Sequence, residues 1–220
     1  MPSREEILAG LSWATNEAFL LSVAWHLLIV AGAFAVALGW RPSRRLAAML
    51  LSAPLVSAGV VALGVGNPFN SLVLSVLAVV LVLLTATAEA PVARGARWSA
   101  AIGIAMMAFG YVYPHFLERG SVLAYFVGAP VGVLPCPTLS LVIGAGLVSG
   151  GLGRRAWSTV LAVAGLFYGV FGVLRLGVIL DVVLAAGAVA LLLATYLPTP
   201  HHVRRSSSHV QTFRRFGDSY

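Results

Sequence analysis

Long apolar segments follow one another through most of this chain, and only short loops separate them. A helix needs about 20 apolar residues to cross a hydrocarbon core about 30 Å thick, and about seven segments meet that length. In lipid, only helices and closed barrels satisfy every backbone polar group, so the sequence predicts an all-α polytopic membrane helix bundle. The segments cover residues 18–40, 46–64, 68–88, 98–117, 121–150, 156–174 and 178–197.

The composition agrees with a membrane environment. Hydrophobic residues make up 60% of the chain and charged residues only 10%, whereas a soluble domain carries about 25% charged residues. Glycine-rich phosphate loops and the H-E-x-x-H and G-x-S-x-G motifs of soluble enzymes do not occur. The sequence therefore favours a protein that is not an enzyme. The lone cysteine excludes an intramolecular disulfide.

Arginines cluster after alternate apolar segments, which predicts the orientation of the chain. Lys and Arg accumulate on the cytoplasmic side of membrane proteins, and this pattern places the N-terminus outside and the C-terminus inside. Because arginine occupies all 14 Lys and Arg positions, we expect a GC-rich bacterial genome. Together with the apolar segments, this predicts a multi-pass protein of the bacterial cytoplasmic (inner) membrane. The clustered residues are Arg41, Arg44, Arg45, Arg94, Arg97, Arg154, Arg155, Arg204, Arg205, Arg214 and Arg215.

The sequence divides into three regions. Ser3 and Glu6 have the spacing of a capping box, so we expect residues 1–17 to form an outer interfacial helix that begins at Arg4. Residues 18–197 form the bundle, whose main partner is the bilayer. Residues 198–220 are too polar to pack, so we expect a disordered cytoplasmic tail that contacts anionic lipid. The net charge of +7 follows from topology, and we expect no nucleic-acid partner.

Pro135-Cys136-Pro137-Thr138 interrupts the fifth apolar segment. Proline breaks a helix, and a straight helix does not need the 30 residues of 121–150 to cross. We therefore expect a helix broken near Pro135–Pro137, with Cys136 as the cap of the second half and Thr138 just inside it. A helix N-terminus favours anions and thiolates. The alternative is that Cys136 is an inert, buried hydrophobic residue.

Further polar residues fall in the outer half of the predicted bundle. Tyr111 and His115 are four residues apart, which places them on one helix face, with Pro114 between them. With Cys136 and Thr138, the candidates for binding a small solute or ion are Tyr111, His115, His26 and Tyr168.

Each of these residues also has a plainer interpretation. Tyrosines near a helix end commonly anchor the helix at the membrane interface. His115 is close in sequence to Glu118 and Arg119, so it is also explained as a solvent-exposed surface residue. His26 has Ser22 one turn away as a hydrogen-bond partner. Asp181 is explained by the helix dipole and by pairing with Arg175.

The chemistry of the candidates leaves three classes of function open. Cys136, His115 and His26 suit copper, zinc or haem iron. They come from three segments without the close spacing of a metal motif, so we expect no metal and no cofactor. The first class is the binding or transport of a small solute or ion through an outer-facing cavity near Cys136. The alternatives are a redox or metal-binding membrane enzyme or electron-transfer subunit, and a membrane scaffold or partner subunit without a small-molecule site.

Several motifs resemble those of a family of uncharacterised bacterial multi-spanning membrane proteins. They are residues 16–25, Tyr113-Pro114, and Gly132 with Pro135-Cys136-Pro137-Thr138 before a glycine-rich helix. The resemblance covers most of residues 12–197, and Leu139-Ser140 departs from the family's pattern. It implies the membrane architecture and marks the cysteine motif, but it implies no activity or substrate.

Overall fold

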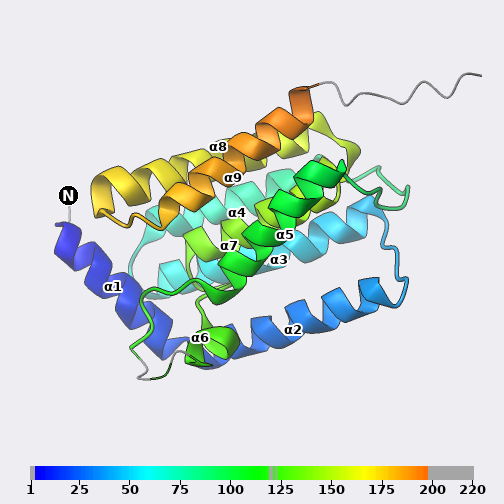
Figure 1. The fold of residues 1–220 in the computed structure, drawn as a ribbon. Helices are drawn as coiled ribbons and strands as arrows, with labels where there is room; N and C mark the ends of the chain where they lie inside the picture. Colours follow the sequence, from blue (N-terminus) through cyan, green and yellow to red (C-terminus); the bar gives the residue numbers. More distant parts are fainter. Residues whose placement is uncertain (1–2, 119–120, 122, 198–220) are drawn as a thin grey trace, which may run out of the picture.

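The computed structural model describes residues 3–118, 121 and 123–197, and the predicted tail at 198–220 lies outside them. The described part is all-helical, and its only strand-like feature is an isolated bridge between Ser43 and Pro91. Figure 1 shows the arrangement of the helices. Their bounds are α1 Arg4–Glu17, α2 Phe19–Ala37, α3 Arg44–Gly64, α4 Pro68–Leu83, α5 Arg97–Val112, α6 Leu123–Gly128, α7 Pro135–Val148, the 3-10 helix η1 Gly151–Gly153, α8 Arg155–Phe171, the π-helix η2 Gly172–Leu176 and α9 Asp181–Tyr196.

The longer helices lie side by side and run between two ends of the molecule (Figure 1). One end holds residues 38–45, 84–97 and 149–155, and we call it the arginine end. The opposite end holds the connections after α3, α5 and α8, and we call it the α1 end because α1 lies across it. The predicted capping box is confirmed: the Glu6 N–H donates to the Ser3 hydroxyl oxygen, and the Ser3 N–H donates to the Glu6 carboxylate.

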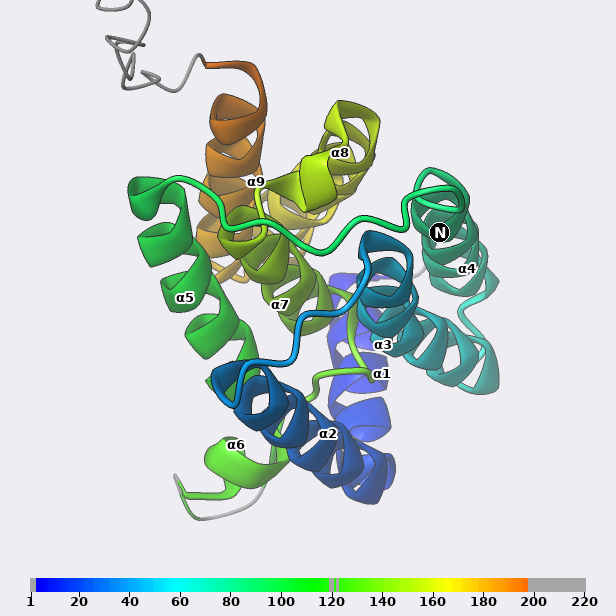
Figure 2. The ribbon, with the colours of Figure 1, turned by 90° about the vertical axis from the view of Figure 1, so that its right-hand side faces the viewer.

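Three helical stretches are long and apolar enough to cross a membrane: Phe19–Ala37, Arg44–Gly64 and Arg155–Leu176. The helices α4, α7 and α9 are apolar but shorter. Only 11% of the apolar window of α2 is buried, and α2 lies at the margin of the bundle (Figure 2). Leu20 and Leu27 of this helix are 80% and 67% exposed. A surface of this kind is suited to lipid.

α7 occupies the centre of the bundle, with α3, α5, α8 and α9 around it (Figure 2). Nearly every residue of α7 is buried. Its contact with α5 is close because two glycines face each other: a Cβ on Gly103 would lie 2.5 Å from the Gly144 carbonyl oxygen. Gly144 packs on α5, whereas Gly146 meets Trp157 of α8.

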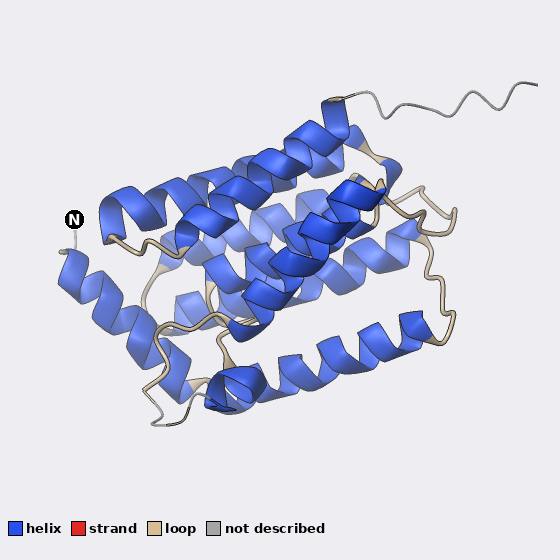
Figure 3. Ribbon diagram, viewed as in Figure 1, coloured by secondary structure: helices blue, strands red, loops and turns tan. Residues whose placement is uncertain are grey.

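The predicted break before the cysteine motif is present, because residues 129–134 separate α6 from α7 (Figure 3). The second half begins earlier than expected: Pro135 is its first residue, and Leu134, not Cys136, is the N-cap. Proline fits the first turn of a helix because N–H groups there have no partner within the helix. Both Pro135 and Pro137 therefore lie inside α7 without breaking it.

We predict opposite effects for one substitution at two helical glycines. Gly103→Ala forces a methyl group against the backbone of α7, so it should lower the free energy of unfolding by about 1–3 kcal/mol. Gly32→Ala in α2 meets nothing within 4 Å, so it should raise the stability by up to about 1 kcal/mol. Thermal unfolding in detergent measures both, and equal effects of the two changes would contradict the close α5–α7 contact.

Candidate functional site

A buried carboxylate joins three elements at the α1 end. Asp181, the first residue of α9, is only 2% exposed. Its Oδ1 accepts a hydrogen bond from the Tyr113 hydroxyl at 2.8 Å, and its Oδ2 accepts one from the Cys136 thiol at 3.3 Å. Tyr113 follows α5, and Cys136 lies in the first turn of α7. We call these three residues the Asp181 cluster.

The ends of α5 and α8 position the cluster. α5 ends at Val112, so Pro114 terminates this helix instead of kinking it, and Tyr113 turns into the protein, where it is fully buried. The general expectation that tyrosines near a helix end anchor it at the interface fails for Tyr113. On the other side, α8 ends in the π-helix η2, where Gly172 leaves room for the carboxylate of Asp181. Single π-helical turns occur frequently at functional sites.

A cavity of about 20 Å³ lies beside the cluster. It is bordered by the cluster residues, by Leu11 of α1 and by Leu176 of η2, among others. A cavity needs roughly 10–15 Å³ to hold one water molecule, whereas a small-molecule site usually measures about 300–1,000 Å³. In this state the cavity has room for water but not for a solute.

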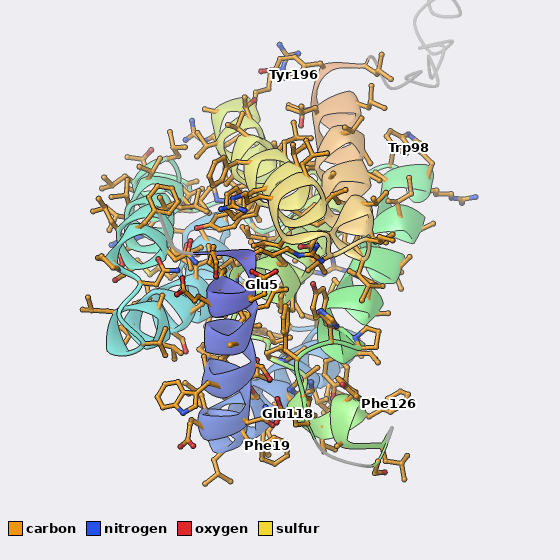
Figure 4. The ribbon with its side chains drawn as sticks, turned by 90° about the vertical axis from the view of Figure 1, so that its left-hand side faces the viewer. Glu5, Phe19, Trp98, Glu118, Phe126 and Tyr196 are labelled. Atoms are coloured by element: carbon orange, nitrogen blue, oxygen red, sulfur yellow. The ribbon has the colours of Figure 1, made fainter. Side chains whose placement is uncertain are left out.

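α1 covers this cavity from the end of the bundle. Asn16 Nδ2 donates to the Phe116 carbonyl oxygen at 3.2 Å, and the Glu118 backbone N–H donates to Asn16 Oδ1 at 3.1 Å. Ser12 donates from its hydroxyl to the Glu118 carboxylate. Figure 4 looks onto this end, with α1 in front and Glu118 beside it. We call these hydrogen bonds the α1 latch.

His26 and Tyr111 form a second polar pair. The His26 ring is 3% exposed and lies 4.3 Å from the Tyr111 ring, measured between centroids. His26 Nδ1 lies 2.8 Å from the Ser22 carbonyl oxygen, and Nε2 lies 2.8 Å from the Tyr111 carbonyl oxygen. Carbonyl oxygens only accept hydrogen bonds, so both contacts are hydrogen bonds only when both nitrogens carry a proton. The partner is the Ser22 backbone, while the Ser22 hydroxyl has no partner.

The other predicted residues are not hydrogen-bond partners of Asp181 in the described structure. Thr138 holds the break, since it donates to the Leu134 carbonyl oxygen and accepts from the Gly132 N–H. Tyr168 donates to Asn70 Oδ1 at 3.1 Å.

His115 does not share a helix face with Tyr111, because α5 ends before it. Its ring packs on Phe116, and partial burial lowers the pKa of this imidazole below its usual value. Of the six predicted residues, only Cys136 belongs to the Asp181 cluster.

Sequence reasoning missed the two oxygen-bearing members of the cluster. Asp181 was assigned to the helix dipole, and Tyr113 was not a candidate. The available signal was an aspartate within a long apolar region, since ionisable residues in such regions are functional candidates by default. In the described part of the chain, no three His, Cys, Asp or Glu side chains gather in a way that could hold a metal ion.

We predict that Tyr113→Phe lowers the stability of the fold. The substitution removes one of the two donors to a buried carboxylate, which should cost about 1–3 kcal/mol. Tyr196→Phe is the matched control, because the Tyr196 hydroxyl also has a hydrogen-bond partner but its side chain is 57% exposed. Chemical or thermal unfolding in detergent measures both variants, and a Tyr113→Phe protein as stable as the control would contradict the role of this hydrogen bond.

Comparison of the chain with protein-family models, with curated proteins and with solved structures found no match.

Proposed function

We propose that the chain crosses a bacterial cytoplasmic membrane seven times, with its N-terminus outside and its C-terminus inside. The spans are α2, α3, α4, α5, α6 with α7, α8 with η2, and α9. The alternating direction of these helices in Figure 1 supports this topology. The charge distribution supports it as well, because the charged residues of the arginine end are seven arginines and a single acidic residue, Glu89. Such an excess of positive charge is typical of cytoplasmic loops.

We further propose that the Asp181 cluster binds and releases a proton, and that the protein uses this site to transport protons or a small solute coupled to them. The observation that carries the proposal is the burial of the Asp181 carboxylate between a hydroxyl and a thiol. Placing an ionisable side chain in a membrane bundle is costly, and such residues commonly form proton relays. The adjoining cavity is the size of a water molecule, which agrees with a proton as the bound species.

The environment of His26 supports the same function. Both ring nitrogens of His26 lie within hydrogen-bond distance of carbonyl oxygens, so His26 is a second polar position inside the bundle. The two positions are connected through α5, because Tyr111 contacts His26 and Tyr113 contacts Asp181. A change at the Asp181 cluster can therefore act on His26 through the end of this helix.

Proton flux into proteoliposomes tests the proposal. With a pH-sensitive dye inside the vesicles and a membrane potential imposed by potassium and valinomycin, the unaltered protein should acidify the lumen faster than empty vesicles do. Asp181→Asn keeps the shape of the side chain but removes its acid group, so the flux should fall to the level of empty vesicles. Glu17→Gln changes an exposed carboxylate of α1 and should leave the flux unchanged. A folded Asp181→Asn protein with full flux would refute the role of Asp181.

The α1 latch predicts how fast Cys136 reacts with a maleimide. Cys136 is the only cysteine, so labelling of the whole protein reports on this thiol alone. Asn16→Ala removes both hydrogen bonds of Asn16 to the Phe116–Glu118 segment. At about 1 kcal/mol for each bond, the labelling rate should rise about tenfold or more. Glu17→Ala, which leaves the latch intact, is the control, and equal rates in the two variants would show that α1 does not control access.

A further inference from the structure

A second and larger cavity, of about 240 Å³, lies at the arginine end. Its walls come from α5, α7, α8, α9 and the connection between α7 and α8. Several of its wall residues are polar, and none of the described residues that line it is acidic. The polar wall residues are Ser99, Arg154, Arg155, Ser158 and Thr195.

Arg154 and Arg155 are the charged residues that line this cavity; both are exposed, and Arg154 Nη2 lies 3.5 Å from Thr87 Oγ1. Arg154 and Arg155 are consecutive and form the junction between the α7–α8 connection and α8. Around them, the arginine end holds seven arginines against Glu89 among its described residues. The Arg44 guanidinium packs against Gly153, which is itself a wall residue, and the Arg44 Nε is buried without a hydrogen-bond partner. The cavity therefore has a positive potential that the residues lining it do not neutralise.

The backbone beside the arginines adds further hydrogen-bond donors. Residues 150–153 all adopt positive φ angles, between 53° and 67°, and bring the chain directly into α8. The N-cap of α8 is Arg154, and no side chain caps the first N–H groups of the helix. A glycine-rich loop that leads into a helix N-terminus presents N–H groups to anions. Here that feature adjoins a charged cavity that is already formed.

Aromatic residues indicate the depth of the cavity in the membrane, and this step rests on the proposed topology. Trp98 and Tyr196 directly adjoin the wall residues Ser99 and Thr195, and they are 43% and 57% exposed. Figure 4 shows them at the outer surface of α5 and α9. Exposed Trp and Tyr side chains lie at the level of lipid headgroups. The cavity thus opens at the depth where phospholipid phosphates lie.

We propose that this cavity binds a phosphate group through Arg154, Arg155 and the first N–H groups of α8. Guanidinium groups match phosphate oxygens with paired hydrogen bonds. A volume of about 240 Å³ accommodates a phosphate together with a small attached group. The phosphate belongs either to an anionic phospholipid headgroup or to free inorganic phosphate, and the two sources share this recognition chemistry.

Calorimetric titration of the purified protein in an uncharged maltoside detergent tests the site. The probes are inorganic phosphate, short-chain phosphatidylglycerol and, as a control without phosphate, a diacylglycerol of the same chain length. The Arg154→Gln/Arg155→Gln variant should bind the phosphate probe at least about tenfold more weakly. The matched control is Arg41→Gln/Arg45→Gln, which removes the same charge from the same end at residues that do not line the cavity. Its affinity should change less than about twofold.

The outcomes separate the sources and can overturn the proposal. Binding of phosphatidylglycerol alone assigns the site to a lipid headgroup, and binding of inorganic phosphate assigns it to the free anion. Equal weakening in both double variants, or no binding of either phosphate probe to the unaltered protein, refutes the site. Ala194→Phe fills the cavity and keeps every arginine, so it should also weaken phosphate binding. If the double variant misfolds, this variant tests the site, and unchanged binding to it refutes the proposal. Since no flux is measured, failure here is distinct from failure of proton transport.

Discussion

The backbone of residues 129–134 must find hydrogen-bond partners inside the bundle, and the arrangement of the centre depends on this requirement. Non-helical backbone in a lipid environment is stable only where the protein supplies partners. Ser57 donates to the Gly132 carbonyl oxygen at 2.6 Å and itself accepts from the Trp25 indole. Thr138 satisfies the Gly132 N–H. Helices α2, α3 and α7 are thereby tied to one short segment, which fixes where α7 begins and where Cys136 lies.

The two ends of the molecule differ in chemistry although the helices between them are alike. At the α1 end, the Asp181 carboxylate is enclosed beneath α1. In its described hydrogen bonds it accepts from two neutral groups, the Tyr113 hydroxyl and the Cys136 thiol. At the arginine end, positive charges surround a cavity that is open to the surroundings. α7 and α8 connect the two regions: Cys136 lies in the first turn of α7, and the other end of α7 leads into residues 150–153. A rigid shift of α7 along its axis would affect both regions at once.

Features set by local sequence could be predicted, whereas features set by contacts between distant segments could not. Ser3 and Glu6 specify the start of α1 within one turn, and Pro135 specifies the start of α7 after the break. Asp181 and Tyr113 are 68 residues apart, and neither carries a local signal for the other. Their contact depends on where α5 ends and on the π-helical end of α8. Arg154 and Arg155 indicate the orientation of the chain in the sequence, but nothing local to them predicts the cavity that they line.

The π-helix η2 has a consequence for how this chain tolerates insertions and deletions. A π-helical turn holds one residue more than an α-helical turn, so η2 is equivalent to a single inserted residue in α8. Deleting that residue would restore a regular helix and would rotate everything after it by about 100°. Asp181 would then begin α9 on a different side, away from Tyr113. The length of this one segment, as much as the identity of any side chain, aligns the carboxylate with its donors.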